Sequence, residues 1–248
     1  MVKIFVTGST GFVGKRLINT LLDQGHEVYA LCRIKGISVF SEDRSNLHYI
    51  WGDLKDPDTL VQLPSIDVAY YLVHSMTDII SSLTTVELEI ANQFVKGIKR
   101  THVQQIIYLG GIINDEKKLS PHLKSRLLVE EVLKKSAIPI TILRASIIIG
   151  SGSASFEIIR DLTEKLPFMI APKWVNTLCQ PIAIRDVLFY LTQVILRKDC
   201  YHKIFDIGGP DVLRFKDLIL EYAKFRKLKR RIINIPVLSP RVSSYWLV

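Results

Sequence analysis

The amino-acid sequence predicts an α/β fold built on a doubly wound parallel sheet, and three observations support this prediction. Short strand-like runs alternate with segments of helical periodicity through the first part of the chain. A glycine-rich turn separates the first strand from the first helix. Of the 248 residues, 48% are hydrophobic and 23% are charged, which is typical of a globular chain. Strands joined by helices form a parallel sheet that helices cover on both faces.

Residue type and period place each element in order. Ser120 and Pro121 mark a helix start, as the cap and the first helical residue, and Gly25 stands where a glycine ends a helix. After about residue 150, prolines interrupt the periodicity. The predicted strands are 3–7, 27–32, 48–51, 67–73, 105–109 and 139–143, and the predicted helices are 12–24, 84–100 and 120–136.

Composition excludes several classes of protein. The apolar runs are far shorter than the ~20 residues that span a membrane. The first residues lack the apolar core of a signal peptide. Cys32, Cys179 and Cys200 lie far apart and form no metal-binding pair or disulfide framework. We therefore expect a cytoplasmic protein with no metal and no membrane among its partners.

The net charge of +9 owes much to one segment, residues 224–231, in which six of eight residues are basic. Such a segment either contacts phosphate groups or forms the solvated end of a helix, where cations suit the helix dipole. Tyr222 and Phe225 are at helical spacing with Leu218, which indicates core positions. This spacing favours the helix end, so nucleic acid is not the expected partner.

Residues 7–14 read TGSTGFVG, directly after a strand and at the start of a helix. The first glycine permits a tight turn, the second lets the backbone approach a pyrophosphate, and the third allows close packing of the helix. The helix N-terminus offers N–H groups and partial positive charge to the diphosphate. We predict a Rossmann-type core over residues 1–150 that binds a dinucleotide through Gly8, Ser9, Thr10, Gly11, Phe12, Val13 and Gly14.

The end of the second strand indicates which dinucleotide is bound. A site for NAD places an acidic residue there to hold the ribose 2′-hydroxyl, but this sequence has Arg33 and Lys35. A guanidinium can pair a 2′-phosphate through two hydrogen bonds, which favours NADP (NADPH) as the cofactor. The alternative is a surface arginine at a strand end.

Further cofactor contacts are predicted after the third and fourth strands. Asp53, followed by Leu54, could accept a hydrogen bond from an adenine amino group, or could serve as an ordinary turn residue. Leu72, Val73 and His74 end the fourth strand, where a doubly wound sheet opens onto its ligand crevice. His74 could contact the cofactor or substrate there, or could be structural.

These motifs carry a family resemblance. The segments TGSTGFVG, RIKG, GDL and LVHSM resemble the extended short-chain dehydrogenases/reductases, and in particular their atypical NmrA-like, epimerase/dehydratase-like branch. The segments LRASIIIGSGSASFEIIRDL, PKWV, QPIAIRDVLFYL, IFDIGGPDVL and IPVLSPRVSSYWLV extend the similarity over essentially the whole chain. The resemblance implies a Rossmann core, a small C-terminal region over the substrate, and a catalytic Ser with a YxxxK pair.

The chain departs from that catalytic pattern. Gly110 and Gly111 stand where the Ser is expected, and the YxxxK position reads HxxxR over His122 and Arg126. A neutral His122 could donate a proton, and Arg126, one helical turn further on, could hold ribose hydroxyls. The guanidinium should also lower the pKa of His122. The alternative is a solvent-facing histidine near a helix start.

The C-terminal region, residues 151–248, should complete the sheet and close the substrate cleft. Arg144, at the carboxyl end of the sixth strand, should either contact an anionic group or form an ion pair with Asp186 or another acid. Pocket-lining candidates for a small-molecule substrate are Phe156, Trp174 and Gln180, with Trp174 as the main aromatic wall.

Two functions remain open at this stage. The first is an NADP-dependent oxidoreductase or epimerase/dehydratase-like enzyme with a degenerate active site. The second is a non-catalytic NADP(H)-sensing regulator or assembly protein, which the missing Ser and Tyr favour. Residues 243–248 end in the apolar run YWLV, so we expect either that they dock on a neighbouring subunit, as in a homodimer, or that the chain is shortened.

Overall fold

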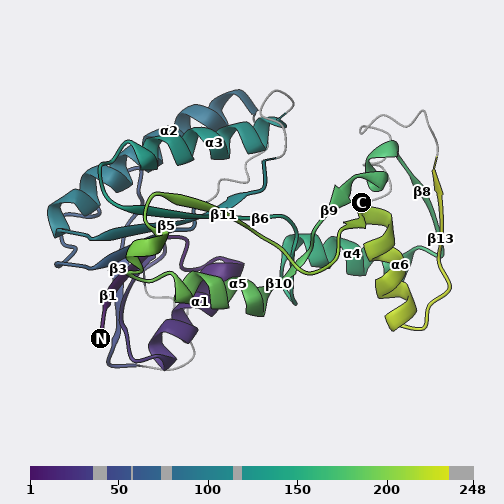
Figure 1. Cartoon of the computed structure of the whole chain (residues 1–248), viewed down its shortest axis with the longest axis horizontal. Coiled ribbons are helices and arrows are strands. Elements are labelled where there is room, and N and C mark those ends of the chain that lie inside the picture. Colours follow the sequence, from purple (N-terminus) through teal and green to yellow (C-terminus); the bar gives the residue numbers. More distant parts are fainter. Residues whose placement is uncertain (36–43, 57, 74–79, 114–118, 235–248) are drawn as a thin grey trace. The chain divides into compact units, whose positions relative to one another are not determined.

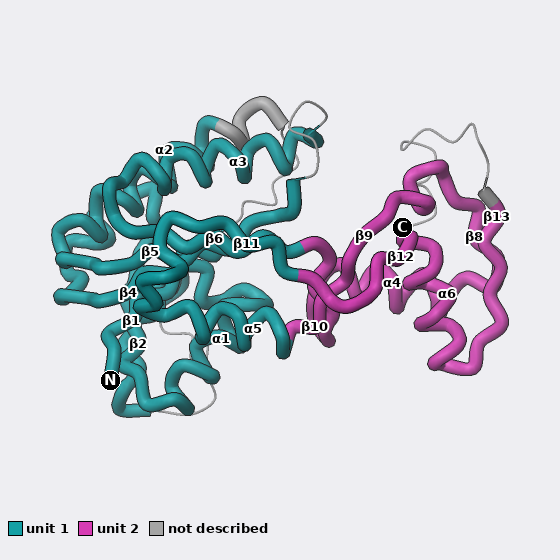
Figure 2. Tube along the Cα trace, in the orientation of Figure 1, with its two compact units in different colours: residues 1–145, 185–207 teal, residues 146–184, 208–248 magenta. Residues whose placement is uncertain are grey.

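The computed structural model describes residues 1–35, 44–56, 58–73, 80–113 and 119–234 (Figure 1). The chain forms two compact units (Figure 2). Unit 1 contains residues 1–145 and 185–207, and unit 2 contains residues 146–184 and 208–248. The chain thus leaves unit 1 after residue 145, returns to it over residues 185–207, and then leaves again. His74 and residues 243–248 lie outside the described residues.

Unit 1 is built on a seven-stranded parallel sheet with the strand order β3-β2-β1-β4-β5-β6-β11. The predicted fold class is confirmed. The strand order reverses between β1 and β4, and ligands of doubly wound sheets bind at such a switch point. The strands are β1 (Lys3–Val6), β2 (Glu27–Cys32), β3 (Leu47–Trp51), β4 (Val68–Tyr71), β5 (Gln105–Gly111), β6 (Ile140–Ala145) and β11 (Lys203–Ile207).

Helices cover both faces of this sheet, as expected of a parallel sheet. Helices α2 and α3 lie on one face, and α1 and α5 lie on the other (Figure 1). On the α2 side, Phe94 packs edge-on against Tyr71, with 4.9 Å between ring centroids. The helices are α1 (Phe12–Asp23), α2 (Ile80–Ile98), α3 (Pro121–Lys134) and α5 (Ile184–Gln193), with short 3-10 turns η1 (Lys99–Thr101) and η4 (Lys198–Cys200).

The local signals at the helix ends act as predicted. The hydroxyl of Ser120 accepts a hydrogen bond from the N–H of Leu123 at 3.3 Å, and Pro121 is the first residue of α3. Gly25 follows α1 with a φ of +78°, a left-handed conformation that favours glycine. These residues fix where α1 ends and α3 begins.

In its described residues, unit 2 contains the helices α4 and α6 and several short strands. Its core joins α4, α6 and β8 through Ile159, Met169 and Ile219, which are all buried. Ser153 caps α4 by accepting from the N–H of Phe156 at 3.1 Å. The elements are β7 (Ile148–Ile149), α4 (Ala154–Lys165), β8 (Phe168–Ala171), η3 (Lys173–Asn176), β9 (Leu178–Cys179), β10 (Ile182–Ala183), β12 (Leu213–Arg214), α6 (Phe215–Phe225) and β13 (Arg231–Asn234).

The predicted core position of Phe225 is wrong, because its side chain is 81% exposed. Ile219 and Ala223 form the buried stripe of α6, and Tyr222 packs beside it. At about 100° per residue, Phe225 lies roughly a third of a turn away from Ile219. It is also the last residue of the helix, so no following turn covers it.

Within the described residues, no helix is long and apolar enough to cross a membrane. In the same part of the chain, no three His, Cys, Asp or Glu side chains are grouped as metal ligands.

Candidate functional site

The glycine-rich turn lies at the carboxyl end of β1, beside the end of β4. Gly8 has a φ of +67°, and a Cβ atom on it would lie 2.6 Å from the carbonyl oxygen of Leu72. Thr7, which is fully buried, ties the two strands together. Its hydroxyl donates to the carbonyl of Tyr70 at 3.0 Å and accepts from the N–H of Leu72 at 3.2 Å. The turn therefore sits at the switch point of the sheet.

Gly14, for which the sequence predicts close packing of the helix, lies against the glycine turn. It is the third residue of α1, and a Cβ atom on it would lie 2.1 Å from the carbonyl oxygen of Gly8 and 3.1 Å from the Cα of Ser9. A side chain would therefore strike the turn itself. The absence of one lets α1 start directly against the backbone of the turn.

The N-terminus of α1 presents backbone donors at this edge of the sheet. Its N-cap residue is Gly11, and no side chain caps the helix. The first N–H groups of a helix have no intrahelical acceptor, and they carry partial positive charge. Thr10 and Gly11 are exposed, while Phe12 and Val13 are half-buried. This end of α1 is suited to an anion such as a diphosphate.

Ser9 has a structural contact that its place in the motif did not predict. Its side chain is fully buried, and its hydroxyl donates to the carbonyl of Leu31 and lies 3.4 Å from the sulfur of Cys32. Ser9 thus holds the glycine turn against the end of β2. Any contact of Ser9 with a ligand falls to its backbone.

Arg33 and Lys35 follow the end of β2, and both side chains are exposed. Among the described residues, neither side chain takes part in an ion pair or a hydrogen bond. Ser9 of the glycine turn contacts Cys32, the last residue of β2, and Arg33 is the next residue along the chain. The backbone of Arg33 is therefore held close to the glycine turn. Both cations stand at the edge where an adenosine ribose lies in this class of fold.

Asp53 adopts the turn geometry that was one of its two predicted roles. Its carboxylate accepts from the N–H of Lys55 at 3.0 Å. The hydroxyl of Thr59 donates to its carbonyl at 2.7 Å. Leu54 is buried at 3% exposure and belongs to the core. A contact of Asp53 with adenine stays a prediction.

His122 and Arg126 both lie on the first turns of α3. His122 is exposed, while partial burial of the ring, and next the guanidinium of Arg126, hold the pKa of His122 below its ordinary value. The pKa shift has the predicted direction, although burial and not Arg126 is its larger cause. A Cβ atom on Gly111, the last residue of β5, would lie 2.9 Å from Leu123 and 3.5 Å from Nη1 of Arg126. Arg126 therefore reaches the strand end at which the family's Ser is expected.

Arg126 carries an unmet hydrogen-bonding group. Among the described residues, its Nε atom is buried without an acceptor. Three polar groups near it were not singled out from the sequence. The hydroxyl of Tyr108 donates to the carbonyl of Arg126 at 3.3 Å, and the hydroxyl of Ser125 donates to the buried carboxylate of Glu87. The sequence could have indicated Glu87 as a functional residue, because it is an acidic residue on the apolar side of a helical pattern.

Arg144 forms the internal ion pair that was one of its two predicted roles, although not with Asp186. Its Nε and Nη2 atoms donate to the two carboxylate oxygens of Glu130 at 3.1 and 2.8 Å. Lys134 also binds Glu130, at 2.8 Å, and Glu130 is only 1% exposed. Asp186 instead pairs with Arg185.

The aromatic and amide candidates for the substrate side belong to unit 2. Phe156 packs edge-on against Tyr222, and Trp174, which is 48% exposed, packs edge-on against Phe215. The side-chain amide of Gln180 donates to the carbonyl of Gly209 at 2.6 Å. Their role in lining a substrate pocket stays a prediction.

The parallel sheet, its switch point and the glycine turn define unit 1 as a Rossmann-type, doubly wound α/β fold. The chain belongs to the NmrA-like family, whose model matches residues 2–166. The fold is similar to that of Pal from Bacillus thuringiensis, with a TM-score of 0.77, 19% identity and coverage of 96% of this chain and 87% of that one. It is also similar to an enzyme of Bordetella bronchiseptica solved in complex with NAD+, with a TM-score of 0.75, 17% identity and coverage of 99% and 91%.

Similar sequences include proteins with different described roles. A photosystem II assembly factor of Cyanophora paradoxa is 23% identical over 94% of this chain and 72% of its own length. A chloroplastic divinyl chlorophyllide a 8-vinyl-reductase of Cucumis sativus is 23% identical over 84% of this chain. The chain spans about half, 52%, of the length of that reductase.

Proposed function

We propose that this protein is an NADP(H)-dependent oxidoreductase of the short-chain dehydrogenase/reductase type, in which His122 and Arg126 replace the usual catalytic pair. The observation that carries the proposal is the uncapped N-terminus of α1 at the switch point, with Arg33 following the adjacent strand. A relative described as a reductase and a structural neighbour bound to NAD+ support a nicotinamide cofactor. NADP in particular is proposed from Arg33 and Lys35.

Each group has a defined task in this proposal. The N–H groups of the first turn of α1 bind the diphosphate, and the absence of side chains at Gly8 and Gly14 keeps the turn close to the helix. Arg33 pairs with the 2′-phosphate. When bound, the nicotinamide supplies or accepts the hydride. Arg126, whose buried Nε needs an acceptor, binds ribose hydroxyls. His122, in its protonated imidazolium form, donates a proton to the substrate oxygen and becomes the neutral imidazole.

Replacement of Arg33 by Ala tests the choice of cofactor. The unmodified protein should bind NADPH at least about tenfold more tightly than NADH, because a charge-assisted hydrogen bond contributes about 1.5–3 kcal/mol. Arg33→Ala should remove most of this preference and leave NADH binding nearly unchanged, since NADH lacks the phosphate. Quenching of protein fluorescence by each dinucleotide measures both affinities and needs no substrate.

The matched control for Arg33→Ala is Lys55→Ala, which removes an exposed cation from the turn after β3. It should leave the preference intact. Higher salt should shrink the preference of the unmodified protein, because Arg33 is exposed. Equal affinity of the unmodified protein for NADPH and NADH would refute the assignment of NADP.

Replacement of His122 by Ala tests catalysis separately from binding. NADPH oxidation is followed at its absorbance with a panel of carbonyl and quinone acceptors. His122→Ala should lower kcat/KM by about a hundredfold or more, as expected for loss of a proton donor, with little change in the Kd for NADPH. Replacement of His102, which lies after η1 and far from α3 in sequence, by Ala should leave turnover unchanged.

A second candidate function is a non-catalytic NADP(H)-sensing or assembly protein. The observation that favours it is the end of β5, where Gly110 and Gly111 supply no hydroxyl to polarise a carbonyl. A relative described as an assembly factor is compatible with this function. Tight NADPH binding without turnover across the whole panel would decide for this candidate.

A further inference from the structure

Strands β8 and β13 of unit 2 form a two-stranded parallel sheet with an apolar outer face. Burial alternates along β8, so that Met169 and Ala171 are buried while Phe168 and Ile170 are 62% and 47% exposed. In the register of the pair, Phe168 lies opposite Arg231 and Ile170 lies opposite Ile233, which is 54% exposed. Residues that alternate in this way share one face of a sheet.

The basic segment, residues 224–231, runs from the end of α6 to the start of β13 beside this face, and it contains two kinds of cation. Arg226 and Arg230 are used internally at the end of α4. Arg226 pairs with Glu164 at 2.7 Å, and Arg230 donates to the carbonyls of Thr163 and Glu164. Cations suit these last carbonyls of a helix. These two arginines hold the segment on unit 2.

The remaining cations of the segment point outward. The side chains of four residues are exposed: Lys224, Lys227, Lys229 and Arg231. Lys224 forms an ion pair with Glu221, with 4.0 Å between its Nζ atom and a carboxylate oxygen. Lys227 has a φ of +57°, and the N–H of Leu228 reaches back to the carbonyl of Ala223 at 2.8 Å. This helix end reverses the chain, so the cations before and after the turn lie near one another.

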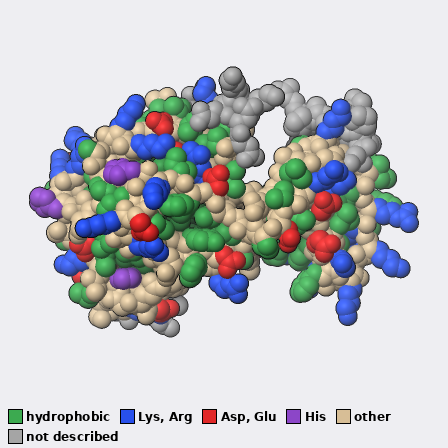
Figure 3. Space-filling view, in the orientation of Figure 1, with side chains coloured by type: hydrophobic (Ala, Val, Ile, Leu, Met, Phe, Trp, Pro, Cys, Tyr) green, Lys and Arg blue, Asp and Glu red, His purple; other side chains and the backbone are tan. Residues whose placement is uncertain are grey.

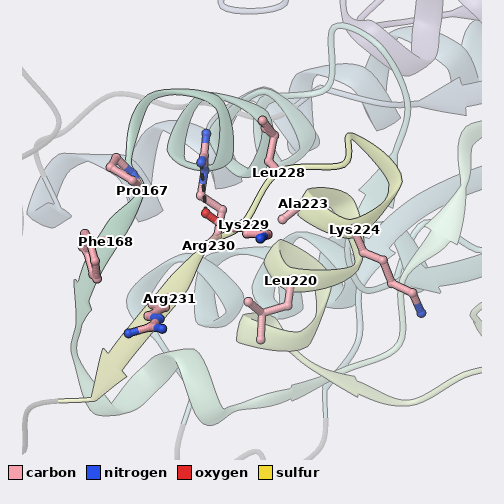
Figure 4. A pocket seen from close by; sticks show the side chains of 9 residues that line it. All are labelled: Pro167, Phe168, Leu220, Ala223, Lys224, Leu228, Lys229, Arg230 and Arg231. Carbon is pink, nitrogen blue, oxygen red and sulfur yellow. Dashed lines mark hydrogen bonds between the residues drawn. The ribbon is translucent and has the colours of Figure 1, made fainter.

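Residues of β8, α6 and the basic segment line one pocket (Figure 4). Phe168, Leu220 and Leu228 contribute apolar surface, and Lys224, Lys229 and Arg231 contribute positive charge. Phe225, which is 81% exposed, ends the helix beside Lys224. In Figure 3, several Lys and Arg side chains project from the edge of the part of the molecule that holds these elements. We name the group of Phe168, Ile170, Phe225, Ile233, Lys224, Lys227, Lys229 and Arg231 the basic-apolar patch.

We propose that the basic-apolar patch docks on an anionic membrane surface. Exposed aromatic and aliphatic side chains beside lysines and arginines fit such a surface, because the apolar groups enter the interface while the cations bind the headgroups. A second copy of the chain is a poor occupant, since two patches of the same charge repel each other. The prediction of no membrane partner rested on the absence of a spanning segment, which does not bear on binding at the surface.

Sedimentation with lipid vesicles tests this proposal. One set of vesicles is pure phosphatidylcholine, and the other is phosphatidylcholine with an equal amount of phosphatidylserine. The unmodified protein should bind the anionic vesicles and not the neutral ones. Lys229→Gln combined with Arg231→Gln should weaken this binding about 25-fold, or about fivefold per charge. Phe225→Ser should weaken it about tenfold or more, because an aromatic side chain no longer enters the interface.

Matched controls separate the patch from net charge and from surface hydrophobicity. Lys198→Gln combined with Lys203→Gln removes two exposed charges from unit 1, and Val212→Ser removes an apolar side chain that is 58% exposed. Both controls should change the affinity for vesicles by less than about twofold. For the lysine control, this is because salt screens the attraction between the membrane and charges outside the patch. Unchanged NADPH affinity in every variant verifies that unit 1 is folded.

Three results would overturn the proposal. The first is equal sedimentation with neutral and anionic vesicles. The second is an equal loss of binding in the patch variants and in their controls. The third is binding of duplex DNA at the same salt concentration, lost in the Lys229 and Arg231 variant, without vesicle binding, which would assign the patch to nucleic acid. None of these results depends on whether the protein turns over a substrate.

Discussion

Gly14→Ala is expected both to destabilise the protein strongly and to abolish its binding of NADPH. The new Cβ atom would lie 2.1 Å from the carbonyl oxygen of Gly8 and 2.9 Å from its carbonyl carbon. Both are backbone atoms, so no side-chain rotation relieves the contact. Overpacking of this kind typically costs about 1–3 kcal/mol, and a collision with fixed backbone belongs at or above the upper end. The turn and the start of α1 must separate, which disrupts the proposed diphosphate site.

The matched control for this variant is Gly25→Ala at the other end of the same helix. Gly25 has a left-handed φ of +78°, but a Cβ atom on it would meet nothing within 4 Å. Its cost should be about 1–2 kcal/mol, from backbone conformation alone, with NADPH affinity retained. Urea unfolding and NADPH titration measure the two quantities independently. If Gly14→Ala retained full affinity, the close approach of α1 to the turn would not matter for the cofactor.

Glu130→Ala is expected to cost about 3–5 kcal/mol in the free energy of unfolding, because it removes one partner of a buried ion pair. Glu130 is 1% exposed, and its carboxylate binds Arg144 through two hydrogen bonds and Lys134 through a third contact. Without the carboxylate, the guanidinium of Arg144 is left largely buried with no counter-charge. Urea unfolding measures the loss.

Glu131→Ala is the matched control, since Glu131 is the next residue of α3 and also binds Lys134, at 3.1 Å. Its side chain is 46% exposed, so the variant should cost about 1 kcal/mol or less. Replacing Glu130 and Arg144 together by Met should recover most of the stability, because no charge is then buried alone. Similar losses in the two single variants would contradict the assignment of Glu130–Arg144 as a buried pair.

The sequence predicted the strands of unit 1 well because their signals are local. The predicted and observed ranges of β2 are the same, and no bound of β1, β3 or β6 differs by more than two residues. Apolar runs bounded by turn residues specify such strands without knowledge of their neighbours. In unit 2 the same approach failed, since prolines and two-residue strands interrupt the periodicity. Ser153 carried the same cap signal as Ser120 and could have located α4.

The candidate site was only partly accessible to the same reasoning. The glycine motif and the replacement of YxxxK by His122 and Arg126 depend on residue identity and spacing, so they could be read directly. The buried hydroxyl of Ser9 could not, because its acceptor on Leu31 is brought to it by pairing of β1 with β2. Glu87 and Ser125 meet because α2 packs against α3.

By itself the sequence determined the doubly wound class, the place of the glycine turn after β1, and the cation after β2, since each follows from local residue patterns. Only the tertiary structure decided the partner of Arg144, the exposure of Phe225 and the return of residues 185–207 to unit 1. Glu130 and Arg144 lie on a helix and a strand that the fold packs together, and their pairing depends on that packing. Phe225 shares its helical spacing with core residues, but whether a side chain is covered depends on which elements lie against it.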